Sequence, residues 1–273
     1  MDNPDQPSVN VLCLKYGVRY PAQYANKLQE GVKRNLQRPH KFYCCTDDPT
    51  GLNPGIEVIP FPENPGIQRG WPDVLVKLML TQDGFGGMSG PTLFLDLDMA
   101  IIGSIDCFFD FHPGENCIIH NWVNWRKRLL GKRPNVGNSS VFRFEAGRSN
   151  FIYETFLKEM ARAEDLTIFN TEQAFMTYAM RQVRWWPEEW CRSYKWHCRP
   201  AFPLNLWVTP KLPADCRILV FHGKPDPEEA IVGYRGKKAH HHIQPAPWIK
   251  EFWNSDSDLG SESDSESIKG NRL

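Results

Sequence analysis

Short apolar runs alternate with an amphipathic stretch along the first sixty residues. The runs predict three buried strands, at Val9–Leu14 (VNVLCL), Lys41–Cys45 (KFYCC) and Glu57–Phe61 (EVIPF). Between the first two, a large apolar residue recurs every fourth position from Tyr24 to Leu36, which predicts a helix with one buried face. The turn-rich segment TDDPTGLNPG separates the second strand from the third.

The alternation continues up to the middle of the chain. Pro72 and Asp73 are typical of the first turn of a helix, which the apolar spacing extends to Leu80. After the loop DGFGGMSGP, the run from Thr92 to Leu97 predicts another strand. Strands alternating with helices indicate a mostly parallel α/β sheet with flanking helices. Ligands of such sheets bind outside the carboxyl ends of the strands.

The second half of the chain predicts fewer regular elements. We expect strands at Ser140–Phe144 and Ile218–Phe221, and helices at Asn150–Ala163 and Thr171–Arg181. From residue 254 the sequence becomes SDSDLGSESDSES, an acidic low-complexity stretch without aromatic residues. The sequence therefore predicts one folded domain over residues 1–253 and a disordered tail over residues 254–273.

Composition and charge exclude several classes of protein. The chain has 273 residues, of which 41% are hydrophobic, and its 32 Lys and Arg balance 32 Asp and Glu. A neutral chain has no overall attraction to nucleic acid, so we expect no nucleic-acid partner. No window approaches the roughly 20 apolar residues of a membrane span, and MDNPDQPSVNVLCL lacks the basic start of a secretory signal. We therefore expect no transmembrane segment and a cytoplasmic location.

The eight cysteines form no C-x-x-C pair, and several lie inside apolar runs. This pattern favours buried reduced thiols over a disulfide framework. Cys191, His197 and Cys198 have the side chains of a zinc site, but their spacing fits no common one and a fourth ligand is missing.

Two aspartates, Asp96 and Asp98, lie at the end of the predicted strand Thr92–Leu97 and are separated by a single residue. Residues i and i+2 of an extended chain point the same way, so the two carboxylates converge where the strand leaves the sheet. A divalent cation such as Mn²⁺ or Mg²⁺ relieves their repulsion, since both ions take oxygen ligands. The alternative is that one aspartate caps the next turn and the other pairs with a lysine.

The string D-x-D means little by itself, because Asp256 and Asp258 in the tail match it without a preceding strand. Haloacid-dehalogenase-like phosphatases also place two aspartates after a strand. They carry Thr or Val two positions later, where this chain has Ala100, and they place the pair near the start of the chain. These differences argue against that family.

A second family matches over a longer stretch. The run VLVKLMLTQDGFGGMSGPTLFLDLDMAIIGSIDCFFDF resembles glycosyltransferase family 8 of the GT-A fold, which includes glycogenin and the bacterial lipopolysaccharide galactosyltransferases. Three further elements are similar to that family and follow in the same order over residues 9–230: Asn138-Ser139-Ser140-Val141, Glu172-Gln173 and Phe221-His222-Gly223-Lys224-Pro225. The resemblance implies a GT-A, Rossmann-like α/β fold and glycosyl transfer.

The chain also departs from the family pattern. The spacing from His222 to Lys224 is shorter, Asp226 replaces a terminal Trp, and Glu172 stands for Asp. The family's asparagine motif has a glycine where this chain has serine. The identity of the donor sugar therefore does not follow from the resemblance.

The resemblance also implies roles for individual residues. Asp96, Asp98 and His222 would bind the Mn²⁺ or Mg²⁺, and Gln173 and Glu172 would be catalytic, with Gln173 beneath the anomeric carbon of a sugar that keeps its configuration. The remaining donor-binding residues would be Lys15, Tyr16, Thr46 and Asp47 around the nucleoside base, Lys224 at the diphosphate, Asn138 at the sugar, and Lys77, Leu97 and Ser139, whose part of the donor the resemblance does not specify. Lys77 could instead pair with Asp96.

The implied partners are a nucleotide-diphosphate sugar, a UDP-sugar first of all, and a carbohydrate or lipid-linked acceptor. The Trp- and Arg-rich segment 184–199 is either the acceptor site or a mixture of core and surface residues, and His240–His242 are read as a solvated run. Two alternatives stay open: a non-catalytic nucleotide-sugar-binding module, and a sugar nucleotidyltransferase. The second normally has a Gly-rich phosphate loop, which KYGVRYP after the first strand lacks.

Overall fold

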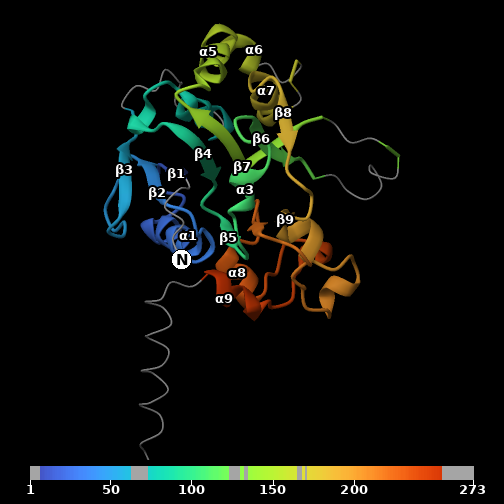
Figure 1. The fold of residues 1–273 in the computed structure, drawn as a ribbon. Helices are drawn as coiled ribbons and strands as arrows, with labels where there is room; N and C mark the ends of the chain where they lie inside the picture. Colours follow the sequence, from blue (N-terminus) through green and yellow to red (C-terminus); the bar gives the residue numbers. More distant parts are fainter. Residues whose placement is uncertain are drawn as a thin grey trace, which may run out of the picture.

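A seven-stranded mixed sheet in the order β3-β2-β1-β4-β7-β6-β8 forms the centre of the computed structural model (Figure 1). The structure describes residues 7–62, 73–122, 130–131, 135–164, 168–169 and 171–253, so the predicted tail 254–273 lies outside it. The strands are β1 (Val9–Lys15), β2 (His40–Thr46), β3 (Ile56–Pro60), β4 (Gly90–Leu95), β6 (Asn116–His120), β7 (Gly137–Ala146) and β8 (Val183–Trp185).

The pairing of these strands confirms the predicted α/β fold class. β1 is parallel to β2 and β4, β2 is parallel to β3, and β6 is parallel to β8. β7 alone runs against its two neighbours, β4 and β6. The carboxyl ends of β1, β2 and β4 consequently lie along one edge, where the polar residues that follow them meet.

A three-stranded sheet extends the fold beyond β4. It contains β5 (Met99–Ile101), β10 (Ile218–Val220) and β9 (Cys191–Ser193), with β10 antiparallel to β5 and parallel to β9. Val220 pairs with Met99, and the next N–H, that of Phe221, donates a hydrogen bond of 2.9 Å to the carbonyl of Asp98. This pairing carries His222 to the segment that holds the two aspartates.

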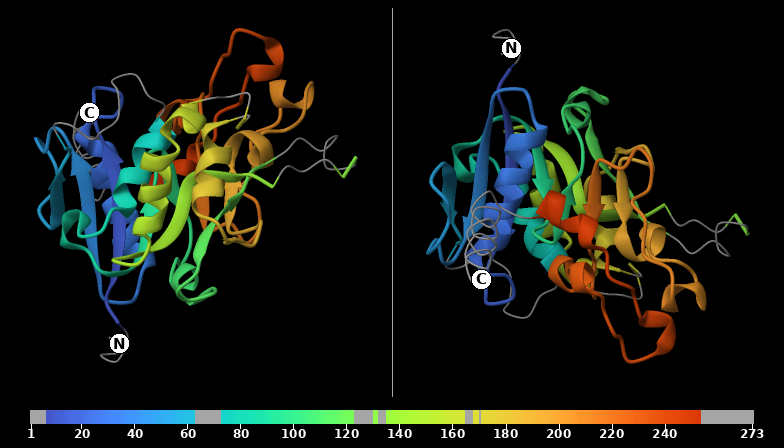
Figure 2. Two further views of the ribbon diagram at one scale, coloured as in Figure 1. Left: turned by 90° about the horizontal axis from the view of Figure 1, so that it is seen from above. Right: turned by 90° about the horizontal axis from the view of Figure 1, so that it is seen from below.

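Helices cover both faces of the central sheet (Figures 1 and 2). On one face α1 (Ala22–Asn35) buries Leu28 and Val32 against Val11 of β1. On the other face, Leu12 of β1 belongs to the apolar layer formed with η1 (Lys77–Thr81), α5 (Asn150–Lys158) and α7 (Glu172–Ala179). The alternation of Val11 and Leu12 therefore places the two sides of one strand in two separate cores.

The remaining short elements connect or border these layers. They are α2 (Asp73–Val76), η2 (Phe85–Gly87), α3 (Cys107–Asp110), α6 (Met160–Glu164), the π-helical turn η3 (Tyr194–Cys198), η4 (Leu204–Leu206), α8 (Pro227–Val232), η5 (Ala239–His241), η6 (Pro247–Ile249) and α9 (Lys250–Trp253). Among the described residues, no helix is both long enough and apolar enough to cross a bilayer.

Several expectations about local structure hold and two need correction. All eight cysteines are free, which confirms the prediction of unpaired thiols. The single helix expected over Asn150–Ala163 is instead two helices, because the chain leaves α-helical geometry at Glu159 between them. The helix expected from Asp73 to Leu80 is α-helical only to Val76 and continues as a 3₁₀ turn.

Candidate functional site

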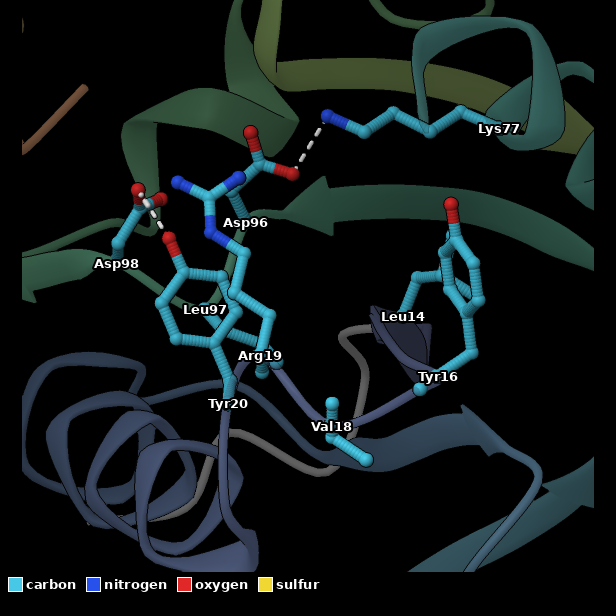
Figure 3. A pocket seen from close by; sticks show the side chains of 10 residues that line it. Leu14, Tyr16, Val18, Arg19, Tyr20, Lys77, Asp96, Leu97 and Asp98 are labelled. Atoms are coloured by element: carbon cyan, nitrogen blue, oxygen red, sulfur yellow. Dashed lines mark hydrogen bonds and ion pairs between the residues drawn. The ribbon is translucent and has the colours of Figure 1, made fainter. Parts of the chain in front are cut away.

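A cavity of about 370 Å³ opens at the carboxyl ends of β1 and β4 (Figure 3). Its walls come from the loop that follows β1 and from the segment that follows β4. The lining residues are Leu14, Tyr16, Gly17, Val18, Arg19, Tyr20, Lys77, Asp96, Leu97 and Asp98. Four of the residues singled out in the sequence for a donor, Tyr16, Lys77, Asp96 and Leu97, therefore share this cavity with Asp98.

Asp96 is the first residue after β4 and is fixed from two directions. Its N–H donates a hydrogen bond of 2.9 Å to the carbonyl of Ser140 on β7, and its Oδ1 lies 2.5 Å from Nζ of Lys77. Lys77 is buried and also donates to the carbonyl of Ser139 at 3.3 Å. Lys77 thus compensates the negative charge of Asp96, which is one of the two roles expected for Lys77.

Asp98 lies deeper, with 9% of its surface exposed. Its Oδ2 accepts a hydrogen bond of 2.8 Å from the hydroxyl of Tyr20 (Figure 3). Burial, and after it the negative charge of Asp96, raise the pKa of the Asp98 carboxyl to about 7. Two carboxylates so close, of which one is difficult to ionise, form a set of oxygen donors that suits Mg²⁺ or Mn²⁺.

The ring of His222 does not join these aspartates. Its Nε2 lies 2.6 Å from the Ser193 hydroxyl, and the ring stacks on Trp122 with centroids 5.3 Å apart. Burial is the main reason that its pKa is lowered to about 4. Over the residues that the structure describes, no three His, Cys, Asp or Glu side chains come together as a metal-binding group. The expectation of three converging protein ligands is therefore not met in this conformation, because Ser193 and Trp122 hold the ring.

Lys224 is placed outside the main cavity. Its Nζ pairs with Asp226 at 2.7 Å and with Glu229 at 2.9 Å, and these two carboxylates raise its pKa. Asp226 and Glu229 form the capping box that begins α8. Lys224 lines a second cavity, of about 370 Å³, which shares Arg19 and Tyr20 with the first.

Of the four residues expected around a nucleoside, only Tyr16 faces the cavity. Its ring stacks on Phe61 with centroids 5.0 Å apart. Lys15 is buried and donates to the carbonyl of Asp48 at 2.9 Å. Thr46 also donates to that carbonyl, at 3.0 Å, and Asp47 accepts the N–H of Gly17 at 2.9 Å. Lys15 and Asp47 therefore tie the loop after β1 to the loop after β2, and Thr46 holds the second loop, while the contact of these three residues with a donor stays a prediction.

The residues expected near the sugar lie farther along the same edge of the sheet. Oδ1 of Asn138 accepts the N–H of Ser140 at 3.0 Å, and Ser139 faces Lys77. Gln173 accepts a hydrogen bond of 3.2 Å from Asn121, the residue after β6. Glu172 begins α7, and its side chain lies outside what the structure describes.

Sequence reasoning missed Val18, Arg19 and Tyr20, which form one wall of the cavity. Tyr20 supplies the one hydrogen bond described for the Asp98 carboxyl, and Arg19 lies near enough to lower the Asp98 pKa in part (Figure 3). The available signal was their place directly after a buried strand, since polar residues at such strand ends face the binding edge.

Solved structures with a similar fold include glycosyltransferases. An active-site glutamine mutant of LgtC aligns with a TM-score of 0.56 and 13% identity over 80% of this chain and 89% of its own. The galactosyltransferase LgtC, in complex with donor and acceptor sugar analogs, aligns with a TM-score of 0.56 and 11% identity over 92% and 99%. The glycosyltransferase GlyE of Streptococcus pneumoniae TIGR4 gives a TM-score of 0.58 and 14% identity over 94% and 64%.

These likenesses confirm the predicted GT-A fold. No family model matches the sequence, and no curated protein is similar enough to match it. At such low identity the comparisons establish the fold, and the chemistry has to be argued from the cavity itself.

Proposed function

We propose that this chain is a glycosyltransferase that moves a sugar from a nucleotide-diphosphate sugar to an acceptor, with a divalent cation bound by Asp96 and Asp98. The observation that carries the proposal is the position of the two carboxylates. They follow the central strand β4 and line a cavity at the edge of the sheet, within a fold whose solved examples include glycosyltransferases.

The residues present fit Mn²⁺ or Mg²⁺. Asp98 is buried next to a second carboxylate, and its pKa is raised to about 7 even though the Tyr20 hydrogen bond and the charges of Lys77 and Arg19 favour its ionised form. A further cation would therefore stabilise its negative charge. When bound, the ion would neutralise charge that develops on the departing diphosphate. His222 would reach it only after exchanging its contact with Ser193.

The chain's own side chains would prepare the cavity for the donor. Lys77 holds Asp96, and Tyr20 holds Asp98, so neither carboxylate has to be ordered when the donor binds. Tyr16 offers a ring to a nucleoside base, with a UDP-sugar as the first candidate. Asn138, Ser139 and Glu172 would contact the sugar.

Gln173 is the candidate for a reaction with retention of configuration. Its side-chain oxygen accepts from Asn121 at the end of β6, and a glutamine is also the residue altered in the active-site mutant of LgtC. An amide oxygen beneath the anomeric carbon would stabilise positive charge without taking a proton. NMR of the product's anomeric proton tests this role, since an inverted linkage contradicts it.

A donor screen tests the proposal as a whole. Nucleotide-diphosphate sugars are tested for binding and slow hydrolysis with Mn²⁺ or with EDTA, using the wild-type chain, Asp98→Asn and Glu154→Gln. Glu154 is an exposed carboxylate on α5, so Glu154→Gln controls for the loss of a charge outside the cavity. We expect binding that needs metal, is lost in Asp98→Asn and is kept in Glu154→Gln.

Other results would point elsewhere. Donor binding that survives both EDTA and Asp98→Asn would refute the metal site. Metal-dependent donor binding with neither hydrolysis nor transfer to any carbohydrate or lipid-linked acceptor would identify a nucleotide-sugar-binding module. Formation of a nucleotide sugar from a nucleoside triphosphate and a sugar phosphate would identify a nucleotidyltransferase.

A further inference from the structure

Exposed apolar side chains gather in the segment that contains η3 and η4. Phe202, Leu204 and Trp207 leave 58%, 56% and 71% of their surfaces exposed. Trp196 and Val208, in the same segment, leave 45% and 39% of their surfaces exposed. Among the described residues, seven other large apolar side chains are comparably exposed, but they are scattered along the chain, whereas these five lie within thirteen consecutive residues. Isolated exposed apolar side chains need no explanation, and a group of five does.

Basic residues border this apolar group. Asn205 donates hydrogen bonds of 3.0 Å to the carbonyl of Ala239 and 2.8 Å to that of His242, which holds η5 beside η4 (Figure 2, orange to red). Lys237 and Lys238, immediately before η5, are exposed. The apolar group of η3 and η4, together with the basic residues at and before η5, is called the docking surface below.

Charge on the docking surface has one sign. Residues 193–213 and 230–250 contain no Asp or Glu, although the chain as a whole is neutral. Desolvation and, after it, the charges of His240 and Arg199 lower the pKa of His241, so cations from both segments lie within electrostatic reach of one another. The surface therefore combines bulky apolar side chains with a local excess of positive charge.

We propose that the docking surface binds the anionic surface of a lipid bilayer, with Phe202, Leu204 and Trp207 entering the interface and Lys237 and Lys238 facing the lipid headgroups. Aromatic and aliphatic side chains flanked by lysine and arginine are suited to the boundary between headgroups and acyl chains. Lysines near the bilayer surface are attracted to anionic lipids.

The aliphatic members of the surface favour a bilayer over a nucleic acid. Leu204 and Val208 gain little from stacking on bases, because stacking needs a planar side chain. In a bilayer the same side chains leave water for an apolar phase. The inference is independent of the proposed glycosyl transfer, since none of these residues lines the cavity of Asp96 and Asp98.

Co-sedimentation with vesicles tests the proposal on the full chain. Phosphatidylcholine vesicles with and without phosphatidylglycerol are compared at low and high salt. We expect binding to the anionic vesicles to be about tenfold stronger or more than to the neutral ones, and to weaken as salt rises. Brominated lipids at the interface should quench part of the protein's tryptophan fluorescence. The same lipids should quench less of the fluorescence of a Trp207→Phe variant.

Two pairs of substitutions separate the apolar and the charged contributions. Phe202→Ser with Trp207→Ser should weaken vesicle binding about tenfold or more, and Lys237→Glu with Lys238→Glu should remove the preference for anionic lipid. Leu157→Ser with Lys158→Glu is the matched control on α5, at the far end of the molecule (Figure 1), and should bind like the wild type. All six side chains are exposed, and circular dichroism checks that each variant folds.

Three results would overturn the proposal: no sedimentation with anionic vesicles, equal binding to neutral and anionic vesicles, or binding that the docking-surface variants do not change. Binding to heparin without binding to vesicles would indicate a surface for acidic polymers and would also overturn it.

Discussion

The hydroxyl of Tyr20 donates a hydrogen bond of 2.8 Å to Oδ2 of Asp98, although 77 residues separate the two along the chain. Tyr20 comes from the loop after β1, and Asp98 comes from the segment after β4. The bond therefore joins the two walls of the cavity and fixes one of the two carboxylates before any ligand arrives. It also lowers the cost of keeping a negative charge in a buried place.

Replacing Tyr20 by Phe should weaken metal binding most strongly near neutral pH. The Tyr20 hydrogen bond lowers the Asp98 pKa, which burial has raised to about 7, so its loss raises that pKa further. A larger fraction of Asp98 is then protonated at pH 7, and Mn²⁺ must displace the proton. Calorimetry should give an affinity for Mn²⁺ that is at least about threefold lower at pH 7 and recovers toward pH 8.5.

Tyr24→Phe is the matched control. The Tyr24 hydroxyl donates to Glu228 instead, at 2.6 Å, while its ring packs against Tyr20 with centroids 4.8 Å apart. Equal effects of the two substitutions, or an effect of Tyr20→Phe that does not depend on pH, would contradict a role through the Asp98 charge.

Asp98→Asn should make the metal-free protein more stable above neutral pH. A carboxyl whose pKa rises from 3.8 to about 7 on folding carries a penalty in its charged form. The penalty is absent below pH 4, grows as the pH rises through this interval and is complete above pH 7. Asparagine cannot ionise, so the variant should gain about 1–4 kcal/mol at pH 8 and little near pH 4.5.

Urea unfolding in EDTA at both pH values measures this gain. Glu154→Gln removes an exposed carboxylate and should leave stability at pH 8 within about 0.5 kcal/mol of the wild type. An Asp98→Asn protein less stable than the wild type at pH 8 would mean that the carboxylate serves the fold and not a ligand.

The sequence predicts the frame of this site because the frame follows from local patterns. Apolar runs mark β1, β2 and β4, and the D-x-D pair comes directly after the last of them. Parallel pairing of those strands then places their carboxyl ends at one edge of the sheet, and this does not depend on the conformation of the loops. For this reason the strand pattern alone assigns Tyr16 and Asp96 to the same binding edge.

The contacts that finish the site could not be predicted in this way. The β5 and β9 strands have three residues each and exist because β10 pairs with both, so no periodicity reveals them. The ring of His222 turns to Ser193, and Lys224 turns to the cap of α8. Each choice of partner depends on residues brought close only by the fold.

Arg143→Lys should destabilise the protein by about 2–4 kcal/mol. The Arg143 side chain is fully buried on β7, and its guanidinium donates to the carbonyls of Phe108, His112 and Glu115. A lysine ammonium cannot reach three carbonyls in a fork, so buried acceptors lose their donors. Chemical denaturation measures the loss.

Arg184→Lys provides the comparison for this prediction. Arg184 is half exposed and pairs with Glu115, and exposed ion pairs contribute little, so a change below about 1 kcal/mol is expected. Similar losses for both arginines would show that burial of Arg143 is not what makes it important.

Lys77→Met should change metal and donor binding in opposite directions. Nζ of Lys77 lies 2.5 Å from Asp96, and the side chain lines the cavity from η1. Methionine keeps most of the volume but removes a positive charge that competes with a cation for Asp96. Lys77 also lowers the Asp98 pKa, so the comparison is made at pH 8.5, where protonation of Asp98 competes least with the metal. We therefore expect Mn²⁺ alone to bind about three- to tenfold more tightly at that pH.

The same positive charge would attract the diphosphate of a donor. Binding of a nucleoside diphosphate in saturating Mn²⁺ should therefore weaken about tenfold in Lys77→Met. Lys158→Met removes an exposed lysine of α5 and should change neither affinity. Calorimetry with Mn²⁺ alone and then with the nucleotide measures both effects. If both affinities fall together, Lys77 acts mainly by keeping Asp96 in place; if only the nucleotide affinity falls, the lysine does not compete with the metal.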